Sequence, residues 1–168
     1  MFVQPFMRFW FACVSPYYKS IKEGRFDEAK EAFLKREQEF FDPIVIKLFQ
    51  EMLKKNFLED SIVDIGSYWD RHAQIDILGI TQSNKRLAGI CKYSDAKVKK
   101  SELSKLTQAC SRVDLEADIY VICSKNGFSN ELKSMKSASL KLYTTKSLKV
   151  LTENLSEKDF IPCQGKKY

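Results

Sequence analysis

The apolar positions in the first third of the chain recur at helical spacing. Pro16 is expected to end or kink the first helix, because proline lacks the backbone N–H that a helix interior needs. Further on, Asp42 followed by Pro43 is typical of a helix start, with aspartate as the N-cap and proline at the first helical position. The pattern therefore predicts separate helices over residues 27–41 and after Pro43.

Beyond residue 57 the pattern changes to short apolar runs that polar turns separate. Strands are predicted over 62–69, 74–80 and 86–93, and a turn at 82–85 joins the last two. The elements expected after this hairpin are a helix over 101–110, a buried strand over 117–123, a helix over 130–136, a strand over 140–143 and a final helical turn capped by Thr144 or Thr145.

The order helix, three strands, helix, strand is typical of an α/β domain in which helices cover both faces of a mixed sheet. A chain of 168 residues suits one compact domain. We expect residues 1–57 to form an N-terminal helical segment that includes the first core helix. Residues 58–168 are expected to form the α/β core.

The predicted hairpin carries an aspartate on one strand and a lysine on the other. If its turn centres on Asn84, then Asp76 and Lys92 lie about opposite each other. Ile90 shares their face of the sheet, because side chains alternate along a strand. The other face then carries Ile75, Ile77 and Cys91. A carboxylate and an ammonium on an apolar ribbon are parts of a metal-assisted phosphodiesterase site, although the same two groups can form a structural salt bridge.

Four short motifs, two of which contain Asp76 and Lys92, can be compared with known families. They are QPFMRFWF at 4–11, IGSYW at 65–69, QIDI at 74–77 and GICKY at 89–93. Together they resemble the PD-(D/E)xK nuclease-like superfamily. More specifically, they resemble the domain of unknown function that follows the P-loop module in archaeal-type ATPases, also found in bacteria. The resemblance covers most of the chain and implies a restriction-endonuclease-like fold with an α-β-β-β-α-β core. Its members are expected to carry Ile-Gly-x-Trp-Trp, Glu-Ile-Asp and Gly-Glu-Cys-Lys-Trp at the last three motifs.

In such nucleases two acidic groups hold Mg²⁺ beside a lysine that assists the attack of water on a phosphodiester. Asp76 and Lys92 match two of these positions, as the resemblance implies. The positions of the other acids hold Ile90, Gln74 and Ile46. Glu51 lies little more than a helical turn from Ile46, and it is the candidate second metal ligand beside Asp76.

These departures imply a degenerate nuclease-like module that binds nucleic acid, an ATPase partner or both without efficient cleavage. A single aspartate holds Mg²⁺ only weakly, so weak Mg²⁺ binding is the most that is expected of a cofactor. An active Mg²⁺-dependent DNA endonuclease is the alternative, in which another element supplies the missing acid. The candidates for that acid are Glu51, Asp64, Asp70 and Asp95. A pure protein-interaction domain is the second alternative.

The net charge of +6 and the pI near 9.0 permit a polyanionic partner without requiring one. Four lysines follow the hairpin on and near the next predicted helix: Lys97, Lys99, Lys100 and Lys105. One interpretation is a solvated helix face. The other is a patch that follows nucleic-acid phosphates, with DNA favoured over RNA and an affinity that falls with salt.

The N-terminal segment is rich in aromatic residues, namely Phe6, Phe9, Trp10, Phe11, Tyr17 and Tyr18. They are expected to be buried against the domain or against another protein, although aromatic rings also stack on bases. No Gly-x-x-x-x-Gly-Lys-Ser/Thr loop occurs, which excludes nucleotide hydrolysis by that route. We therefore expect a split-off domain or a remnant that pairs with a separate P-loop ATPase. An aromatic face that no partner covers would favour self-association.

The five cysteines are an odd number, widely spaced and without a Cys-x-x-Cys pair, and the sequence has one histidine. This pattern argues against a zinc site and a disulfide framework and favours a reducing cytoplasm. The histidine, His72, is expected to lie in a loop. The apolar run at 9–14 is too short to span a membrane, and Arg8 interrupts it. No membrane association is expected.

Overall fold

The computed structural model describes residues 5–153 of the chain. Two compact units divide between Lys47 and Leu48. The first unit is helical, and its elements are α1 (Pro5–Phe9), the π-helix η1 (Trp10–Val14), the 3₁₀ helix η2 (Ser15–Tyr17), α2 (Tyr18–Lys22) and the larger part of α3 (Asp27–Asn56). The predicted helical segment, residues 1–57, ends one residue beyond α3.

The backbone of the first unit changes helix type at the predicted proline. The α-helical turns of α1 widen into the π-helix η1, and η2, which contains Pro16, follows as a 3₁₀ turn. Proline removes one backbone donor, so regular i→i−4 bonding cannot continue through it. The predicted interruption at Pro16 is confirmed.

The separate helices expected on either side of Asp42 and Pro43 are wrong, because α3 runs through the proline without a break. Pro43 has no N–H to donate to the carbonyl of Glu39, four residues earlier. The guanidinium of Arg8 donates to that carbonyl instead, with Nη2 2.8 Å from the Glu39 oxygen. Arg8 also lies 6.0 Å from the ring centroid of Phe40. A donor from a distant part of the sequence thus replaces the bond that proline removes.

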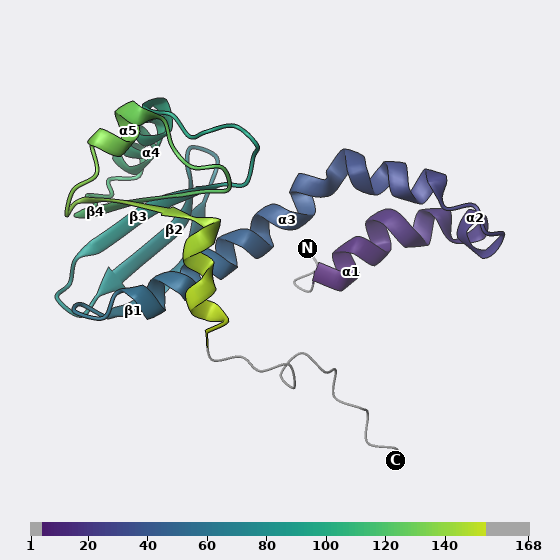
Figure 1. The fold of residues 1–168 in the computed structure, drawn as a ribbon, viewed down its shortest axis with the longest axis horizontal. Helices are drawn as coiled ribbons and strands as arrows, with labels where there is room; N and C mark the ends of the chain where they lie inside the picture. The colour runs from purple at the N-terminus through teal and green to yellow at the C-terminus, as the bar shows by residue number, and fades with distance from the viewer. Residues whose placement is uncertain (1–4, 154–168) are drawn as a thin grey trace, which may run out of the picture. The chain divides into compact units, whose positions relative to one another are not determined.

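The second unit contains a five-stranded sheet (Figure 1). Its strands are β1 (Ile62–Trp69), β2 (Gln74–Thr81), β3 (Arg86–Lys92), β4 (Ile119–Ser124) and β5 (Leu140–Thr144), in that spatial order. The first three strands are antiparallel, while β4 and β5 run parallel to their neighbours. The remaining elements are α4 (Lys100–Arg112), α5 (Asn130–Ser134) and the 3₁₀ helix η3 (Thr145–Leu151).

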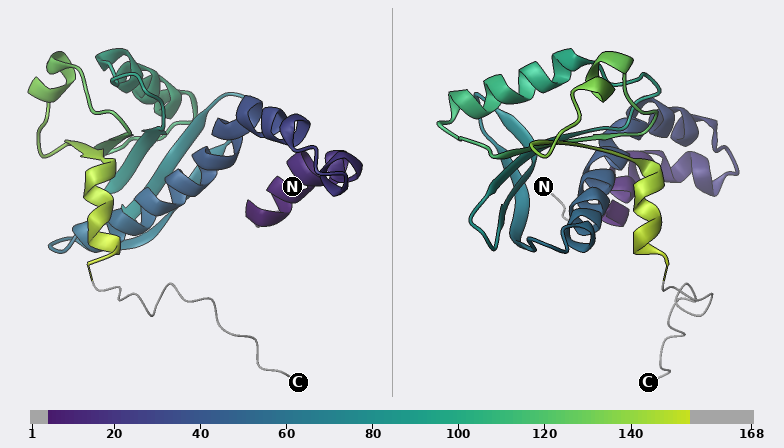
Figure 2. Two further views of the ribbon diagram at one scale, coloured as in Figure 1. Left: turned by 45° about the vertical axis from the view of Figure 1, so that its right-hand side comes forward. Right: turned by 60° about the vertical axis from the view of Figure 1, so that its left-hand side comes forward.

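Helices flank this sheet on both faces, with α4 and α5 on one side and the end of α3 on the other (Figure 2). The α/β class, the mixed sheet and the α-β-β-β-α-β order are therefore confirmed. Thr144, one of the two residues predicted to cap the final helical turn, is the N-cap of η3. Its side chain makes no capping hydrogen bond. No helix within residues 5–153 has the length and apolar character needed to cross a bilayer.

The core of the second unit lies between these layers. A cluster of buried residues joins the helices to the strands: Ile75, Ala88, Ile90, Val98, Leu106, Cys110, Ile122, Phe128, Leu132 and Leu140. The end of α3 contributes Phe49, Met52 and Leu53, which are at most 1% exposed. Burying a side chain of this size stabilises the fold by about 1.5–3 kcal/mol. The end of α3 is therefore part of the α/β core.

Gly89 allows the three central strands to pack closely. A Cβ at this position would lie 2.6 Å from the Val121 carbonyl oxygen and 3.2 Å from Cβ of Ile77. The glycine that opens the GICKY motif is therefore required by the close approach of β3 to its neighbours.

The turn between β2 and β3 lies at the predicted residues, but the register of the hairpin differs from the prediction. Ile80 pairs with Arg86, so the loop runs from Thr81 to Lys85 and centres on Ser83. Two bonds close it: the Thr81 N–H donates to the Lys85 carbonyl at 3.0 Å, and the Lys85 N–H donates to the Thr81 hydroxyl at 3.1 Å. The expected pairing shifts by two residues as a result.

Candidate functional site

The register places Asp76 opposite Ile90 instead of Lys92, since Ile77 pairs with Gly89. A shift of two residues keeps side chains on the same face. Asp76, Ile90 and Lys92 accordingly line one cavity of about 180 Å³. We call it the aspartate cavity, and its other lining residues are Gln74 of β2 with Glu102, Lys105, Leu106 and Ala109 of α4. The common face of the three predicted residues is thus present, although their pairing is different.

Asp76 is a buried carboxylate with protein donors on both oxygens. Its side chain belongs to a residue that is 7% exposed. Oδ1 accepts from Nε2 of Gln74 at 2.9 Å, and Oδ2 accepts from the backbone N–H of Cys91 at 2.9 Å. The carboxylate thus connects β2 to β3.

The backbone of Asp76 is fixed from the other side by polar groups of α3 and β1. Its carbonyl accepts from Nε2 of Gln50 at 2.9 Å and from the hydroxyl of Ser67 at 2.7 Å. The Gln50 amide also donates to the Gly66 carbonyl at 3.0 Å. Hydrogen bonds from α3, β1 and β3 therefore hold Asp76 of β2 in place.

Lys92 pairs with a glutamate that the sequence interpretation did not consider. Its Nζ lies 3.2 Å from Oε2 of Glu102 on α4. The ion pairs of residues 5–153 do not include one between Asp76 and Lys92. Asp76 and Lys92 therefore line one cavity without forming a salt bridge with each other, because Lys92 extends to Glu102 of α4.

Glu102 lies between two lysines. Its Oε1 is 2.6 Å from Nζ of Lys105, in addition to the contact of Oε2 with Lys92. The hydrogen bond from Lys105 lowers the pKa of Glu102, the bond from Lys92 and the charges of both lysines lower it further, and burial opposes them. The side chain is 18% exposed. The spacing of Glu102 and Lys105, three residues apart on a predicted helix, was the available signal for this ion pair.

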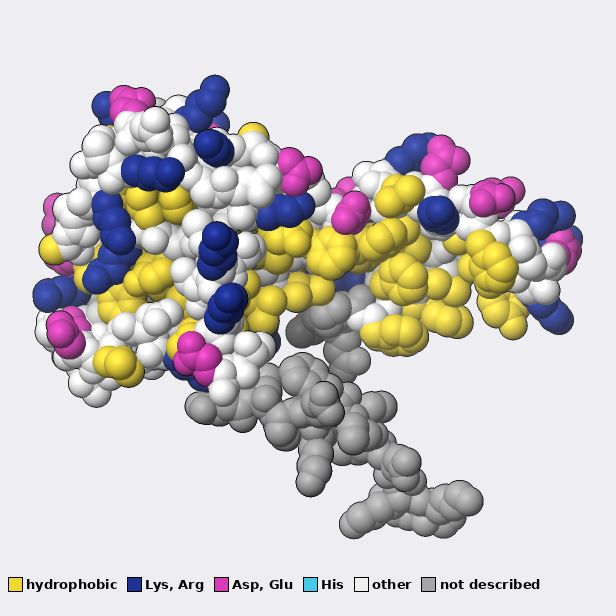
Figure 3. All heavy atoms as spheres, in the orientation of Figure 1, with side chains coloured by type: hydrophobic (Ala, Val, Ile, Leu, Met, Phe, Trp, Pro, Cys, Tyr) yellow, Lys and Arg dark blue, Asp and Glu magenta, His cyan; other side chains and the backbone are white. Residues whose placement is uncertain are grey.

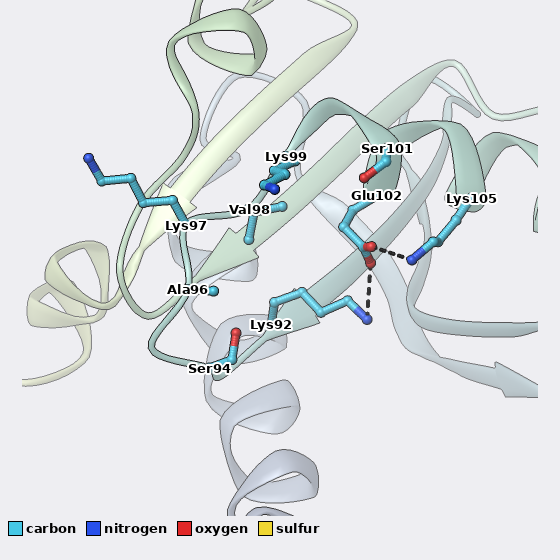
Figure 4. A pocket seen from close by; sticks show the side chains of 9 residues that line it. All are labelled: Lys92, Ser94, Ala96, Lys97, Val98, Lys99, Ser101, Glu102 and Lys105. Atoms are coloured by element: carbon cyan, nitrogen blue, oxygen red, sulfur yellow. Dashed lines mark hydrogen bonds and ion pairs between the residues drawn. The ribbon is translucent and has the colours of Figure 1, made fainter.

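A second, larger cavity of about 300 Å³ adjoins the first and shares Lys92, Glu102 and Lys105 with it. We call it the lysine cavity (Figure 4). Its full lining is Lys92, Ser94, Ala96, Lys97, Val98, Lys99, Ser101, Glu102 and Lys105. Figure 4 shows the side chains of Lys92 and Lys105 converging on Glu102, while Lys97 extends away from it.

Three of the four lysines predicted after the hairpin thus line this cavity, namely Lys97, Lys99 and Lys105. The fourth, Lys100, does not, and its Nζ lies 3.3 Å from Glu131 of α5. Four lysines and one glutamate give the lysine cavity a net charge of +3.

The acids expected to complete a metal site lie elsewhere. Glu51 is 50% exposed and pairs with Lys54 at 2.9 Å. The remaining three have separate neighbours: Asp64 accepts from the Ile65 N–H, Asp70 accepts from the N–H groups of His72 and Ala73 in the β1–β2 turn, and Asp95 pairs with Lys125 at 2.8 Å. None of the four lines the aspartate cavity.

The arrangement around Asp76 leaves few open oxygens for a divalent cation. Both of its oxygens accept from protein donors, and Glu102, the other carboxylate of the cavity, is held by two lysines. No group of three or more His, Cys, Asp or Glu side chains within residues 5–153 is placed to hold a metal ion. Mg²⁺ usually keeps several of its waters and is bound by only one or two carboxylates. Those few carboxylate oxygens must therefore be accessible to it.

Comparison with known proteins supplies a family. Residues 10–105 match the model of DUF234, described as archaeal and bacterial proteins of unknown function. Among solved structures, the chain is similar to a repair endonuclease from Pyrococcus abyssi, with 12% sequence identity and a TM-score of 0.39. That similarity covers 58% of this chain and 43% of the endonuclease chain, so it spans less than half of that protein. No curated protein matches the chain.

Proposed function

This chain belongs to the DUF234 family of archaeal and bacterial proteins, and we propose that it is a nucleic-acid-binding module that does not cleave its ligand efficiently. The observation that carries the proposal is the lysine cavity with its net charge of +3, beside an aspartate whose oxygens are already bound. DNA is the expected ligand.

The lysine cavity suits phosphate groups of a nucleic-acid backbone. Lys92, Lys97, Lys99 and Lys105 present ammonium groups, and Ser94 and Ser101 add hydroxyls that donate to phosphate oxygens. Lys92 is the last residue of β3, Lys99 is the N-cap of α4 and Lys105 lies on α4, while Lys97 lies in the loop that joins the two elements. Contacts of this kind release counterions, which makes the affinity strongly dependent on salt.

Cleavage is not expected, for three reasons that concern the same cavity. Ile90 offers no metal ligand at the position where nucleases of the PD-(D/E)xK type are expected to carry glutamate. The Asp76 oxygens accept from Gln74 and from the backbone of Cys91. Lys92 is paired with Glu102, so its charge is partly neutralised before any substrate arrives.

The experiment is the retention of a fluorescent DNA duplex by the full chain over a range of salt concentrations. We expect binding that weakens steeply between about 50 and 200 mM salt, with the duplex intact in Mg²⁺ or Mn²⁺. The double change Lys97→Glu and Lys99→Glu is expected to weaken binding by about 100-fold. Lys146→Glu and Lys149→Glu, at exposed lysines of η3, are the matched control. Equal weakening by both pairs, or no binding by the unchanged protein, would overturn the proposal.

A second candidate function is a metal-dependent DNA endonuclease, which one observation favours. Glu102 lines the aspartate cavity together with Asp76 and Lys92, so two carboxylates and a lysine do meet there. Plasmid nicking in Mg²⁺ or Mn²⁺ tests this function. It predicts nicking that chelator abolishes and that both Asp76→Asn and Glu102→Gln remove, while the first proposal predicts none.

A further inference from the structure

The helical unit before residue 48 exposes an unusual number of large apolar side chains. Six of them are Phe6, Phe9, Trp10, Tyr18, Phe26 and Leu34, between 37% and 64% exposed. We call this set the aromatic face. Hydrophobic side chains gather along the helices of this unit in Figure 3. Exposed apolar surface of this extent on a soluble protein marks a site of association.

The unit buries little of its own apolar surface. Its buried hydrophobic residues are Cys13, Phe40 and Val45. Phe9 packs edge-on against Phe33 and Phe40, with ring centroids 5.7 and 6.3 Å away, and this contact joins α1 to α3. This unit, Met1–Lys47, is only slightly longer than the limit of about 40 residues below which domains usually need metals, disulfides or oligomerisation to be stable. Four of the five cysteines lie within residues 5–153, and these four form no disulfide.

The size of the aromatic face matches what a homodimer needs. Aromatic side chains have about 150–250 Å² each to bury. At the observed exposures, the six residues together offer on the order of 600 Å². A standard interface buries roughly 800 Å² on each partner, and about 65% of a homodimer interface is apolar. That corresponds to about 520 Å² of apolar surface from each copy.

The charge of this unit favours a second copy over a polyanion. Residues 1–47 contain eight Lys or Arg and seven Asp or Glu, a net charge of +1 out of the +6 of the whole chain. Several of these charges pair within the unit, including Arg25 with Glu23 at 2.6 Å and Lys35 with Glu31 at 2.7 Å. A net charge this small would oppose contact between two copies only weakly.

We infer that the aromatic face is the contact between two copies of this chain. The helices of one copy pack against the same helices of the other about a two-fold axis, in the manner of a helix bundle. Trp10 and Phe6, whose ring centroids lie 6.0 Å apart, contact their equivalents or neighbours in the second copy.

The test is the oligomeric state of the full chain, measured by analytical ultracentrifugation at several concentrations. We expect a dimer that Phe6→Lys with Trp10→Lys dissociates, with a loss of at least about 100-fold in association. The matched control is Leu58→Lys with Trp69→Lys, at side chains of the second unit that are 82% and 79% exposed. The control protein is expected to remain a dimer.

One further measurement and one further variant show whether a loss of dimer reflects a loss of folding. Circular dichroism reports whether the variant keeps its helices, and Phe6→Lys alone, at a residue that is 64% exposed, replaces the double change if it does not. A monomeric unchanged protein would overturn the inference, whether the face then binds a separate ATPase or packs within its own chain. Equal dissociation of the control would overturn it too.

Discussion

The two halves of the candidate site differ in how their charged groups are held. Asp76 is 7% exposed, and each of its oxygens accepts a hydrogen bond from β2 or β3. The side chain of Lys92 is 45% exposed, and its partner Glu102 belongs to a different element, α4. The first arrangement is part of the fold, whereas the second is an ionic contact that solvent or a phosphate can replace. We therefore propose that residues which would act together in a nuclease have separate roles here.

Two residues of one motif are therefore held in different physical environments, Asp76 within the sheet and Lys92 at a half-exposed ion pair. Removing a group that satisfies buried donors affects stability first. Removing a half-exposed ion-pair partner affects stability little and ligand binding more. The comparison can therefore be tested by measuring both stability and ligand binding for variants of Asp76 and of Lys92.

The largest effect is expected from Asp76→Ala. It leaves the Cys91 N–H and the Gln74 amide without their acceptor, and hydrogen bonds to charged groups contribute about 1.5–3 kcal/mol each. We expect the free energy of unfolding in urea to fall by about 3 kcal/mol. Asp95→Ala is the control, since that side chain is 85% exposed. A change no larger than that of the control would show that Asp76 is not structural.

Lys92→Met should show the opposite behaviour. Stability is expected to stay close to that of the unchanged protein, because methionine keeps the aliphatic stem. DNA affinity is expected to fall by about tenfold, and the slope of affinity against salt should decrease by about one phosphate contact. Fluorescence anisotropy at several salt concentrations measures both. Lys146→Met serves as the control, and an equal fall there would remove any special role for Lys92.

Glu102→Gln is expected to strengthen DNA binding by about three- to tenfold. The change releases Lys92 and Lys105 from their shared carboxylate and raises the net charge of the lysine cavity from +3 to +4. Glu131→Gln, which releases Lys100 outside the cavity, should leave affinity unchanged. Weaker binding by the Glu102 variant would mean that the glutamate positions the lysines for the ligand.

The smallest effect concerns pH. Because its lysine partners lower the pKa of Glu102 in the folded state, the ion pair contributes stability above the unfolded pKa, near 4.3. That contribution is lost as the pH falls through the lower, folded pKa. Stability should therefore decline more steeply below about pH 4.5 in the unchanged protein than in Glu102→Gln, by less than about 1 kcal/mol. Parallel curves from urea unfolding at each pH would contradict this.

The sequence was sufficient for the strands, the turn and the common face of Asp76, Ile90 and Lys92. These features depend on alternation within a few residues, which the sequence displays directly. The register was not predictable in the same way, because the bonds between Thr81 and Lys85 move the centre of the loop by one residue. A loop centre that moves by one residue changes each cross-strand partner by two.

Two other differences arise from contacts between distant parts of the sequence. Where α3 passes through Pro43, the donor to the Glu39 carbonyl is Arg8, 31 residues earlier in the sequence. The role of Glu102 depends on which face of α4 lies over the sheet. Local patterns contain no information about which distant side chain reaches a given group. The sequence therefore named Asp76, Lys92 and the helix residue Lys105 among the residues that line the two cavities, but it did not name Glu102.

The most direct test of the account is a crystal of the full chain soaked with Mn²⁺ and examined by anomalous diffraction. The account predicts no peak beside Asp76, with the Gln74 amide still bound to Oδ1 and the Cys91 N–H still bound to Oδ2. A Mn²⁺ ion bound at about 2.2 Å by oxygens of both Asp76 and Glu102 would contradict it, because the cavity would then hold the metal of a working nuclease.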